Sequence, residues 1–123
     1  MSTNGAAQLS PWLDPVPGNV AEARRFVTEA LAGRKGPLDD CELMVSELAT
    51  NAVRHGRSMF RVGVYRQGGP VRVEVSDYNS RLPVEAAAGT DAQSGRGLQI
   101  VDSLSSCWGV RPEAEGKTVW FEL

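Results

Sequence analysis

The hydrophobic pattern changes its period near Phe60, and this change constrains the fold more than any other feature. Before it, apolar residues recur every three or four positions, as on one face of an amphipathic helix. After it, valines alternate with polar residues over 60–65 and 71–76, which is typical of strands with one buried face. Gln67-Gly68-Gly69 between the two runs predicts a hairpin turn. Helices followed by paired strands indicate helices packed on a sheet, the α+β class.

Two helices are predicted before the change of period. The first spans about 20–32, with Asn19 and Glu22 in the spacing of a capping box at its start. The second opens after Gly36-Pro37 and continues to Gly56, with its apolar positions on one face. This second helix carries the strongest periodic signal in the chain.

The second half of the chain predicts a long loop, a helix and a final hairpin. The irregular segment 78–94 is long for a compact domain, which suggests a lid. Gly95-Arg96-Gly97 then leads into a short helix that begins at Leu98. Two more strands are predicted around 107–111 and 117–123. The predicted architecture is a two-layer α/β sandwich whose mixed, mostly antiparallel sheet is covered on one face by helices.

Length and composition predict one domain. The chain has 123 residues, of which 41% are hydrophobic and 23% charged, enough for a single core. We therefore expect one domain over 1–123. Its small polar start, about 1–12, predicts a flexible segment, although Leu9, Trp12 and Leu13 are compatible with a short edge strand.

Charge and residue usage exclude several classes of partner. The net charge is −2 and the basic residues are scattered, so no nucleic-acid partner is expected. No apolar run is long enough for a membrane span, and the first residues lack the pattern of a signal peptide, so we expect a cytoplasmic protein. Cys41 and Cys107 lie in apolar settings, which predicts reduced core thiols. A single His makes a zinc site improbable.

Polar residues border the apolar stripe of the second helix. Glu47, Asn51 and His55 are spaced i, i+4, i+8, so they line one edge of the helix where it meets the core. Buried polar groups need partners. An Asn oxygen is a suitable ligand for Mg²⁺, and a Glu one turn away can accept a proton or orient a nucleophile. The alternative is a polar seam that caps backbone groups or contacts water.

Three further positions carry weaker signals when taken separately. Asp77 ends a valine-rich strand, where its carboxylate can accept donors of an adenine-type edge or cap the following turn. Gly95 and Gly97 precede a helix, where backbone amides can approach an anion, or they belong to an ordinary loop. Thr118 on the final strand is a candidate contact for phosphate or adenine, or simply a strand residue.

The order of these elements resembles the GHKL superfamily of ATP-binding domains. The residues that carry the resemblance are Ser46-Glu47-Leu48-Ala49-Thr50-Asn51-Ala52-Val53-Arg54-His55, Val73-Glu74-Val75-Ser76-Asp77 and Gly95-Arg96-Gly97-Leu98-Gln99-Ile100-Val101. Within the superfamily, the chain is most similar to the stand-alone anti-sigma-factor serine/threonine kinases of bacteria. The resemblance covers the chain from about Val20 to Leu123 and implies a Bergerat-type ATP-binding fold.

The resemblance also implies a role for each matching position. Glu47 is implied as the base or orienting group for an incoming serine hydroxyl, and Asn51 as the ligand of Mg²⁺. The implied ATP-binding residues are Asn51, His55, Asp77, Gly95, Arg96, Gly97, Leu98 and Thr118. The implied cofactors are ATP and Mg²⁺, and the implied partners are a sigma factor and an anti-anti-sigma protein that is phosphorylated on serine. A homodimer is implied in the same way.

One departure from the family pattern keeps a second function open. Family members usually have Asp-x-Gly-x-Gly at the adenine-binding aspartate, whereas this chain has Asp77-Tyr78-Asn79-Ser80-Arg81. The intact Glu47 favours a kinase, and the altered residues after Asp77 favour a non-catalytic regulator that binds a nucleotide or a protein. A ligand-free structural domain is the third alternative, and it requires the ordered motifs to be a coincidence.

Overall fold

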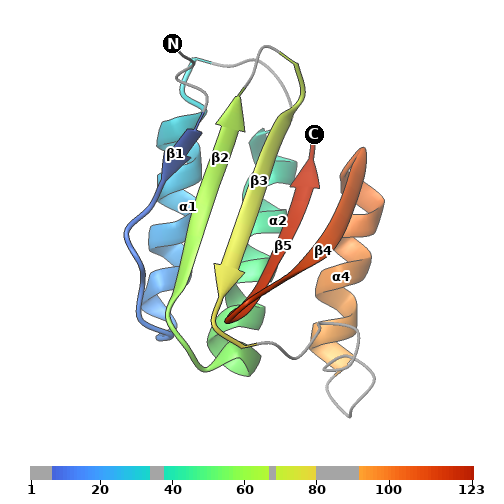
Figure 1. Cartoon of the computed structure of the whole chain (residues 1–123). Helices are drawn as coiled ribbons and strands as arrows, with labels where there is room; N and C mark the ends of the chain where they lie inside the picture. Colours follow the sequence, from blue (N-terminus) through green and yellow to red (C-terminus); the bar gives the residue numbers. More distant parts are fainter. Residues whose placement is uncertain (1–6, 34–37, 67–68, 80–91) are drawn as a thin grey trace.

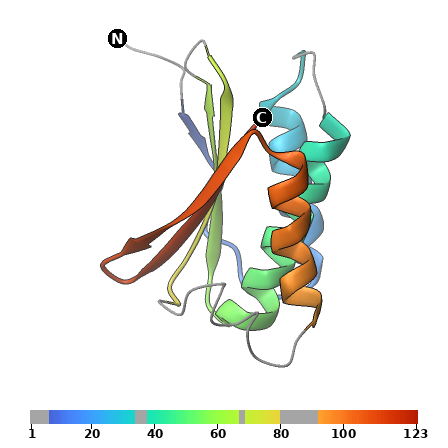
Figure 2. The same ribbon diagram turned by 90° about the vertical axis from the view of Figure 1, so that its right-hand side faces the viewer.

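The fold has two layers, a sheet and a set of helices on one of its faces (Figure 1, Figure 2). The computed structural model describes residues 7–33, 38–66, 69–79 and 92–123. The strands are β1 (Ala7–Leu9), β2 (Phe60–Arg66), β3 (Val71–Asp77), β4 (Cys107–Glu113) and β5 (Gly116–Glu122), in the order β1-β2-β3-β5-β4. The helices are α1 (Gly18–Ala30), α2 (Leu38–Asn51) with its continuation η1 (Ala52–Gly56), and α4 (Ala92–Leu104). The predicted α+β sandwich is confirmed, and every strand pair is antiparallel.

The start of the described chain is an edge strand. The small polar residues of this region predict flexibility, but Ala7–Leu9 pairs with β2 and a bridge joins Leu13 to Phe60. Backbone bonds explain the difference, because Ser10 N–H donates to Val62 O at 2.8 Å and Leu13 N–H to Phe60 O at 2.7 Å. The alternative of a short edge strand is therefore confirmed at residues 7–9.

Helix α1 begins two residues earlier than its apolar spacing indicates. The predicted capping box is wrong, because Pro17 is the N-cap and Asn19 already lies inside the helix. The Asn19 amide donates instead to Asp14 O at 2.9 Å, and Glu22 forms an ion pair with Arg25 at 3.0 Å. The helix ends at Ala30, followed by the left-handed Gly33 with φ 82°.

Helix α2 changes geometry in its last turn. Ala52–Gly56 is a π-helix, in which the amide of Arg57 donates to Ala52 O, five residues back, at 3.1 Å. Arg57 then leaves the helix in a left-handed conformation with φ 50°. The predicted continuous helix up to Gly56 is therefore present, but its last turn is wider. Single π turns of this kind occur often at functional sites.

The core lies between the two layers. Helices α1 and α2 contribute the apolar stripes that their spacing predicts, and β2, β3 and β5 contribute every second residue. The fully buried side chains from the helices and the sheet include Val27, Met44, Val45, Phe60, Val62, Val64, Val73 and Phe121. Each such side chain stabilises the fold by about 1.5–3 kcal/mol relative to an exposed one.

The register of β3 and β5 decides which side chains share a face of the sheet. Residues directly opposite each other in antiparallel strands point to the same side. Val75 pairs with Val119 on the helix side, and two residues further along Asp77 pairs with Lys117 on that same side. The intervening pair, Ser76 and Thr118, faces away from the helices. No described element covers this second face, which we call the open face (Figure 2).

The two cysteines occupy different environments. Cys41 is a fully buried core thiol, as predicted, and burial raises its pKa to about 12. Cys107 is exposed, so its assignment to the core is wrong. It begins the edge strand β4, opposite Glu122 on the open face, and its thiol donates to the carboxylate of Glu122 at 3.3 Å.

Candidate functional site

The sequence motifs converge at one end of the molecule. Helix α2 ends there, helix α4 begins there, strand β3 ends there and strand β5 begins there (Figure 1, Figure 2). Helix α4 packs against α2 in the helix layer. Strand β3 pairs with β5 in the sheet layer. Four segments that are far apart in the sequence are therefore brought together at this end.

Glu47 and Asn51 face helix α4 across a short gap. A Cβ atom added at Gly97 lies 3.2 Å from Asn51 Nδ2 and 3.4 Å from Glu47 Oε1. The tips of both side chains therefore surround the same point on α4, and any residue larger than glycine there crowds them. The polar edge of α2 faces α4 and is not a simple solvated face. Both side chains are half-buried, which leaves them partly open to a ligand.

The glycine motif has a different setting from the one predicted. Helix α4 begins at Ala92, so Gly95, Arg96 and Gly97 lie inside the helix and not in a loop before Leu98. Gly97 serves close packing of α4 on α2, a use of glycine that a loop prediction misses. Leu98 is buried beside it. The predicted lid falls largely on residues 80–91, outside the described residues.

His55 does not continue the row of Glu47 and Asn51 in regular phase. Asn51 is the last α-helical residue, and His55 belongs to the π turn, where the rotation per residue changes. The backbone carbonyl of His55 accepts a hydrogen bond from Asn79 Nδ2 at 2.9 Å. The structure therefore ties His55 to the segment that follows Asp77.

Asp77 is buried and paired with a lysine. Lys117 Nζ lies 3.1 Å from Asp77 Oδ1 and 3.0 Å from Oδ2, and the two side chains are 9% and 6% exposed. Because β3 and β5 pair at this position, the ammonium group sits directly opposite the carboxylate on the helix side of the sheet. The two hydrogen bonds from Lys117 hold the Asp77 carboxylate in position.

Asn79 completes this arrangement with three hydrogen bonds. Its backbone amide donates to Asp77 Oδ1 at 2.8 Å, and its backbone carbonyl accepts from Lys117 Nζ at 3.0 Å. Its side chain reaches the carbonyl of His55. The segment after Asp77 lacks the glycines of the family pattern. Its Asn79 instead forms hydrogen bonds to Asp77 on β3, Lys117 on β5 and His55 at the end of the second helix. We call Asp77, Asn79 and Lys117 the latch.

Thr118 is not brought to the side of Asp77. It is 1% exposed on the opposite side of the sheet, and its hydroxyl bonds with Ser76 Oγ at 2.8 Å and with the carboxylate of Glu113 at 3.3 Å. The physical reason is the alternation of side chains along β5, which points neighbouring residues to opposite faces. Lys117, one residue earlier, occupies the place next to Asp77.

Lys117 and Asn79 were missed by the sequence-based selection of site residues. A signal for Lys117 exists, because it is in phase with Val119 and Phe121 on the inward side of β5, where a charge needs a partner. Asn79 carries no comparable signal. Its importance depends on a turn that returns to Asp77 and on the carbonyl of His55, neither of which a spacing pattern specifies.

A magnesium site made of protein groups alone is not found among the described residues, since no cluster of three or more metal-ligating side chains occurs there. This fits the usual mode of Mg²⁺ binding, in which one or two protein oxygens act together with substrate phosphates and water. Asn51 and Glu47 converge near Gly97 and supply oxygen donors of this kind. The residues present are therefore compatible with a magnesium–nucleotide complex.

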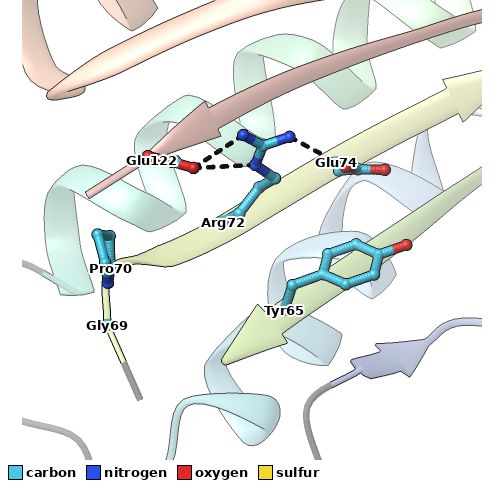
Figure 3. A pocket seen from close by; sticks show the side chains of 6 residues that line it. All are labelled: Tyr65, Gly69, Pro70, Arg72, Glu74 and Glu122. Atoms are coloured by element: carbon cyan, nitrogen blue, oxygen red, sulfur yellow. Dashed lines mark hydrogen bonds and ion pairs between the residues drawn. The ribbon is translucent and has the colours of Figure 1, made fainter. Parts of the chain in front are cut away.

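Two described cavities lie away from these residues. One, of about 430 Å³, is on the open face and is lined by Tyr65, Gly69, Pro70, Arg72, Glu74 and Glu122 (Figure 3). Its charged groups already pair with one another, and burial together with Glu74 raises the pKa of Tyr65. The other, also about 430 Å³, lies between α4 and Trp108. Neither cavity contains Glu47, Asn51 or Asp77.

Comparison with known families identifies the domain. The sequence profile described as histidine kinase-like ATPase domain matches residues 13–123. The chain belongs to this family. A comparison with curated protein sequences gave no match.

The fold is also similar to a solved structure. It matches the crystal structure of the RsbU and RsbW domains of Rv1364c from Mycobacterium tuberculosis, with a TM-score of 0.69 and 22% sequence identity. The match covers 94% of this chain and 31% of that chain. At this identity the similarity supports the fold alone. Together with the family, it places the domain among GHKL-type ATPase domains, for which ATP is the implied ligand. Within the described residues, no helix is long and apolar enough to cross a membrane.

Proposed function

We propose that this protein is an ATP-dependent protein serine/threonine kinase that acts as an anti-sigma regulator. In this proposal it sequesters a sigma factor and phosphorylates a protein antagonist of that complex on serine. The proposal combines the shared ATPase family with the motif order that resembles anti-sigma-factor kinases. The observation that carries it is the convergence of Glu47 and Asn51 on Gly97, where α2 meets α4.

The proposed roles follow from the chemistry of each side chain. Glu47 accepts the proton of the attacking serine hydroxyl or orients that hydroxyl toward the γ-phosphoryl group. Asp77 accepts a hydrogen bond from the exocyclic amino group of adenine. Asn51 and the nucleotide phosphates together hold Mg²⁺, which neutralises phosphate charge when bound. Because phosphoryl transfer depends mainly on positioning and electrostatics, such a small set of protein groups is sufficient.

The first test is calorimetric titration of the purified protein with Mg-ATP, in parallel with Asn51→Ala and Asp77→Ala. Binding that both substitutions weaken supports the nucleotide site, and the matched control is Asn19→Ala, because that amide only contacts a nearby carbonyl. Absence of binding at high ATP concentration overturns the proposal. Transfer of labelled γ-phosphate to a candidate antagonist then tests the kinase, with Glu47→Gln expected to bind ATP and lose transfer.

A non-catalytic regulator is the second candidate, and the latch is the observation that favours it. Asp77 is paired with Lys117, and Asn79 and Arg81 stand where the family pattern has its two glycines. Such a protein binds its sigma factor and does not turn over ATP. ATP binding without phosphate transfer to any antagonist tested, together with a stable sigma-factor complex by size-exclusion chromatography, is the result that favours this candidate. The same chromatography tests the proposed homodimer.

A further inference from the structure

The latch places Lys117 directly beside Asp77, the aspartate that binds adenine in the proposed function. We propose that Lys117 is a positioning residue for base recognition, which holds the Asp77 carboxylate so that Oδ2 offers one remaining acceptor site to the amino group of an adenine nucleotide. This inference rests on the proposed function and adds a residue to it. Lys117 is 8% exposed as a whole residue and lies on the otherwise apolar helix side of β5.

The ammonium of Lys117 contacts acceptors of Asp77 and Asn79. A lysine ammonium has three N–H donors and no acceptor. Its acceptors are Asp77 Oδ1 at 3.1 Å, Asp77 Oδ2 at 3.0 Å and Asn79 O at 3.0 Å. These contacts direct the ammonium at Asp77 and at the carbonyl of Asn79. Its effect on a nucleotide passes through Asp77.

The hydrogen bonds of Asp77 are not complete. An ionised carboxylate has about four acceptor sites on its two oxygens. Lys117 uses one on each oxygen, and the Asn79 amide uses a second on Oδ1. Counting contacts with the described residues, one site remains, on Oδ2. That number matches the single N–H that an exocyclic amino group directs at a carboxylate.

Binding through this remaining site leaves the ion pair intact. A ligand that displaced Lys117 would leave a buried cation without its partner, which is strongly unfavourable. Asn79 adds to this constraint, because it binds both members of the pair and is itself tied to the carbonyl of His55. The latch thus replaces the family's glycine-rich turn with a rigid support for the aspartate.

The experiment compares two nucleotides that differ only in the amino group. ATP and purine ribonucleoside triphosphate, which lacks the exocyclic amino group, are titrated into the wild type, Lys117→Met, Lys117→Arg and the control Arg111→Met. Arg111 contacts Glu74 on the open face, so its removal deletes an ion pair without touching the latch. Folding of every variant is checked by circular dichroism and thermal melting.

We expect Lys117→Met to weaken ATP binding about tenfold or more and to leave binding of the analogue nearly unchanged, because a hydrogen bond to a charged group is lost. Lys117→Arg restores much of the difference between the two nucleotides, and Arg111→Met changes neither affinity. If Lys117→Met does not fold, Lys117→Gln keeps a donor toward Asp77 without the charge, and the same selective loss is expected, to a smaller extent.

Three results overturn the inference. Equal loss for both nucleotides means that Lys117 has only a structural role. Tighter ATP binding in Lys117→Met means that the lysine obstructs the base site, and unchanged affinities mean that it has no part in recognition. In all three cases the wild type still binds ATP, so the proposed function stands. If the wild type binds neither nucleotide, the proposed function fails and this inference fails with it.

Discussion

The two faces of the sheet carry charge in different ways. On the helix side, the buried charged residues in the described part of the chain are Asp77 and Lys117, among apolar side chains. On the open face, Arg72 and Arg111 share the carboxylate of Glu74 and each contacts a second carboxylate, that of Glu122 or Glu113. Arg72 also lies over the ring of Trp120 at 4.1 Å. On the open face Arg72, Arg111 and Glu74 each have two ion-pair partners, whereas Asp77 and Lys117 form an ion pair only with each other among the described residues.

The two faces therefore differ in what happens when one charged side chain is removed. Loss of one arginine on the open face leaves the buried Glu74 carboxylate with the other arginine, and water solvates the arginine side chains, which are 34% and 46% exposed. Loss of Lys117 leaves Asp77 buried with only the Asn79 amide as a hydrogen-bond partner given by the structure. The ion pair without an alternative partner, Asp77–Lys117, is the one at the end of the sheet where the sequence motifs meet.

The largest expected effect is on stability, from Lys117→Ala. Removing one member of a buried ion pair costs about 3–5 kcal/mol in the free energy of unfolding. Arg111→Ala, the matched change on the open face, is expected to cost no more than about 1 kcal/mol, because its side chain is 46% exposed and Arg72 remains near Glu74. Urea denaturation of both variants measures the difference, and equal costs would remove the distinction between the two faces.

Glycine substitutions extend the comparison from charge to packing. A Cβ atom added at Gly116 lies 1.9 Å from the backbone oxygen of Asp77, and one added at Gly109 lies 2.8 Å from a ring carbon of Trp120. A backbone atom in a paired strand has little room to move, whereas a half-buried ring on the open face can rotate. We expect Gly116→Ala to cost about 3 kcal/mol and Gly109→Ala about 1 kcal/mol in stability.

Thermal melting of the two variants, supported by urea titration, measures this difference. A Gly116→Ala variant as stable as the wild type would show that β5 can shift relative to Asp77. In that case the latch is adjustable and the close approach at Gly116 is not a constraint on the aspartate.

The sequence predicts the layers of this fold better than it predicts the partners of its polar residues. Helical and alternating periods arise within one segment, so the two main helices and the strand pairs follow from local spacing. The contact between Asp77 and Lys117 depends on the register of strands 40 residues apart, which no local pattern contains. For the same reason Thr118 was selected and its neighbour was missed.

The glycine motif and the helix start show the same limit. Two glycines in three residues indicate a loop by local propensity, yet helix α4 runs through them because Gly97 allows close contact with α2. Tertiary packing overrides propensity there. The capping box fails similarly, because Pro17 already starts α1 before Asn19. The sequence does predict Glu47 and Asn51, because both lie on one helix. Their position beside its apolar stripe follows from local spacing alone.

Gly97→Ala tests the helix side by function, with a smaller expected effect. Alanine is the better helix former by up to about 1 kcal/mol, so stability is expected to change little. Its Cβ lies 3.2 Å from Asn51 Nδ2, which is tighter than ordinary contact, so the Asn51 amide has to shift slightly. Since small displacements of positioned groups reduce binding and transfer steeply, we expect at least about a tenfold loss of ATP affinity or phosphate transfer.

The control for Gly97→Ala is Gly63→Ala on the open face, where the added Cβ meets the side chains of Leu9 and Tyr65. It is expected to change stability and not ATP affinity. Equal ATP affinities for wild type and Gly97→Ala would show that the close contact between α2 and α4 does not position Glu47 and Asn51 for a ligand.

The smallest expected effect is on thiol reactivity. The comparison is between Cys41 in the helix layer and Cys107 on the open face. Burial raises the pKa of Cys41 from 9.0 to about 12, so the folded protein keeps this thiol protonated where an unfolded chain begins to ionise. Its contribution to stability is therefore complete below pH 9.0 and is lost as the pH rises toward 12.

The hydrogen bond to Glu122 raises the pKa of Cys107 as well, but this thiol is exposed. In the folded protein, a thiol reagent at about pH 8 should label Cys107 and not Cys41. The reaction of Cys107 should be slow for an exposed thiol, because its raised pKa lowers the thiolate fraction. After urea is added, both cysteines should be labelled. Cys107→Ser should show no labelling while folded, and rapid labelling of Cys41 there would mean that the helix side opens without global unfolding.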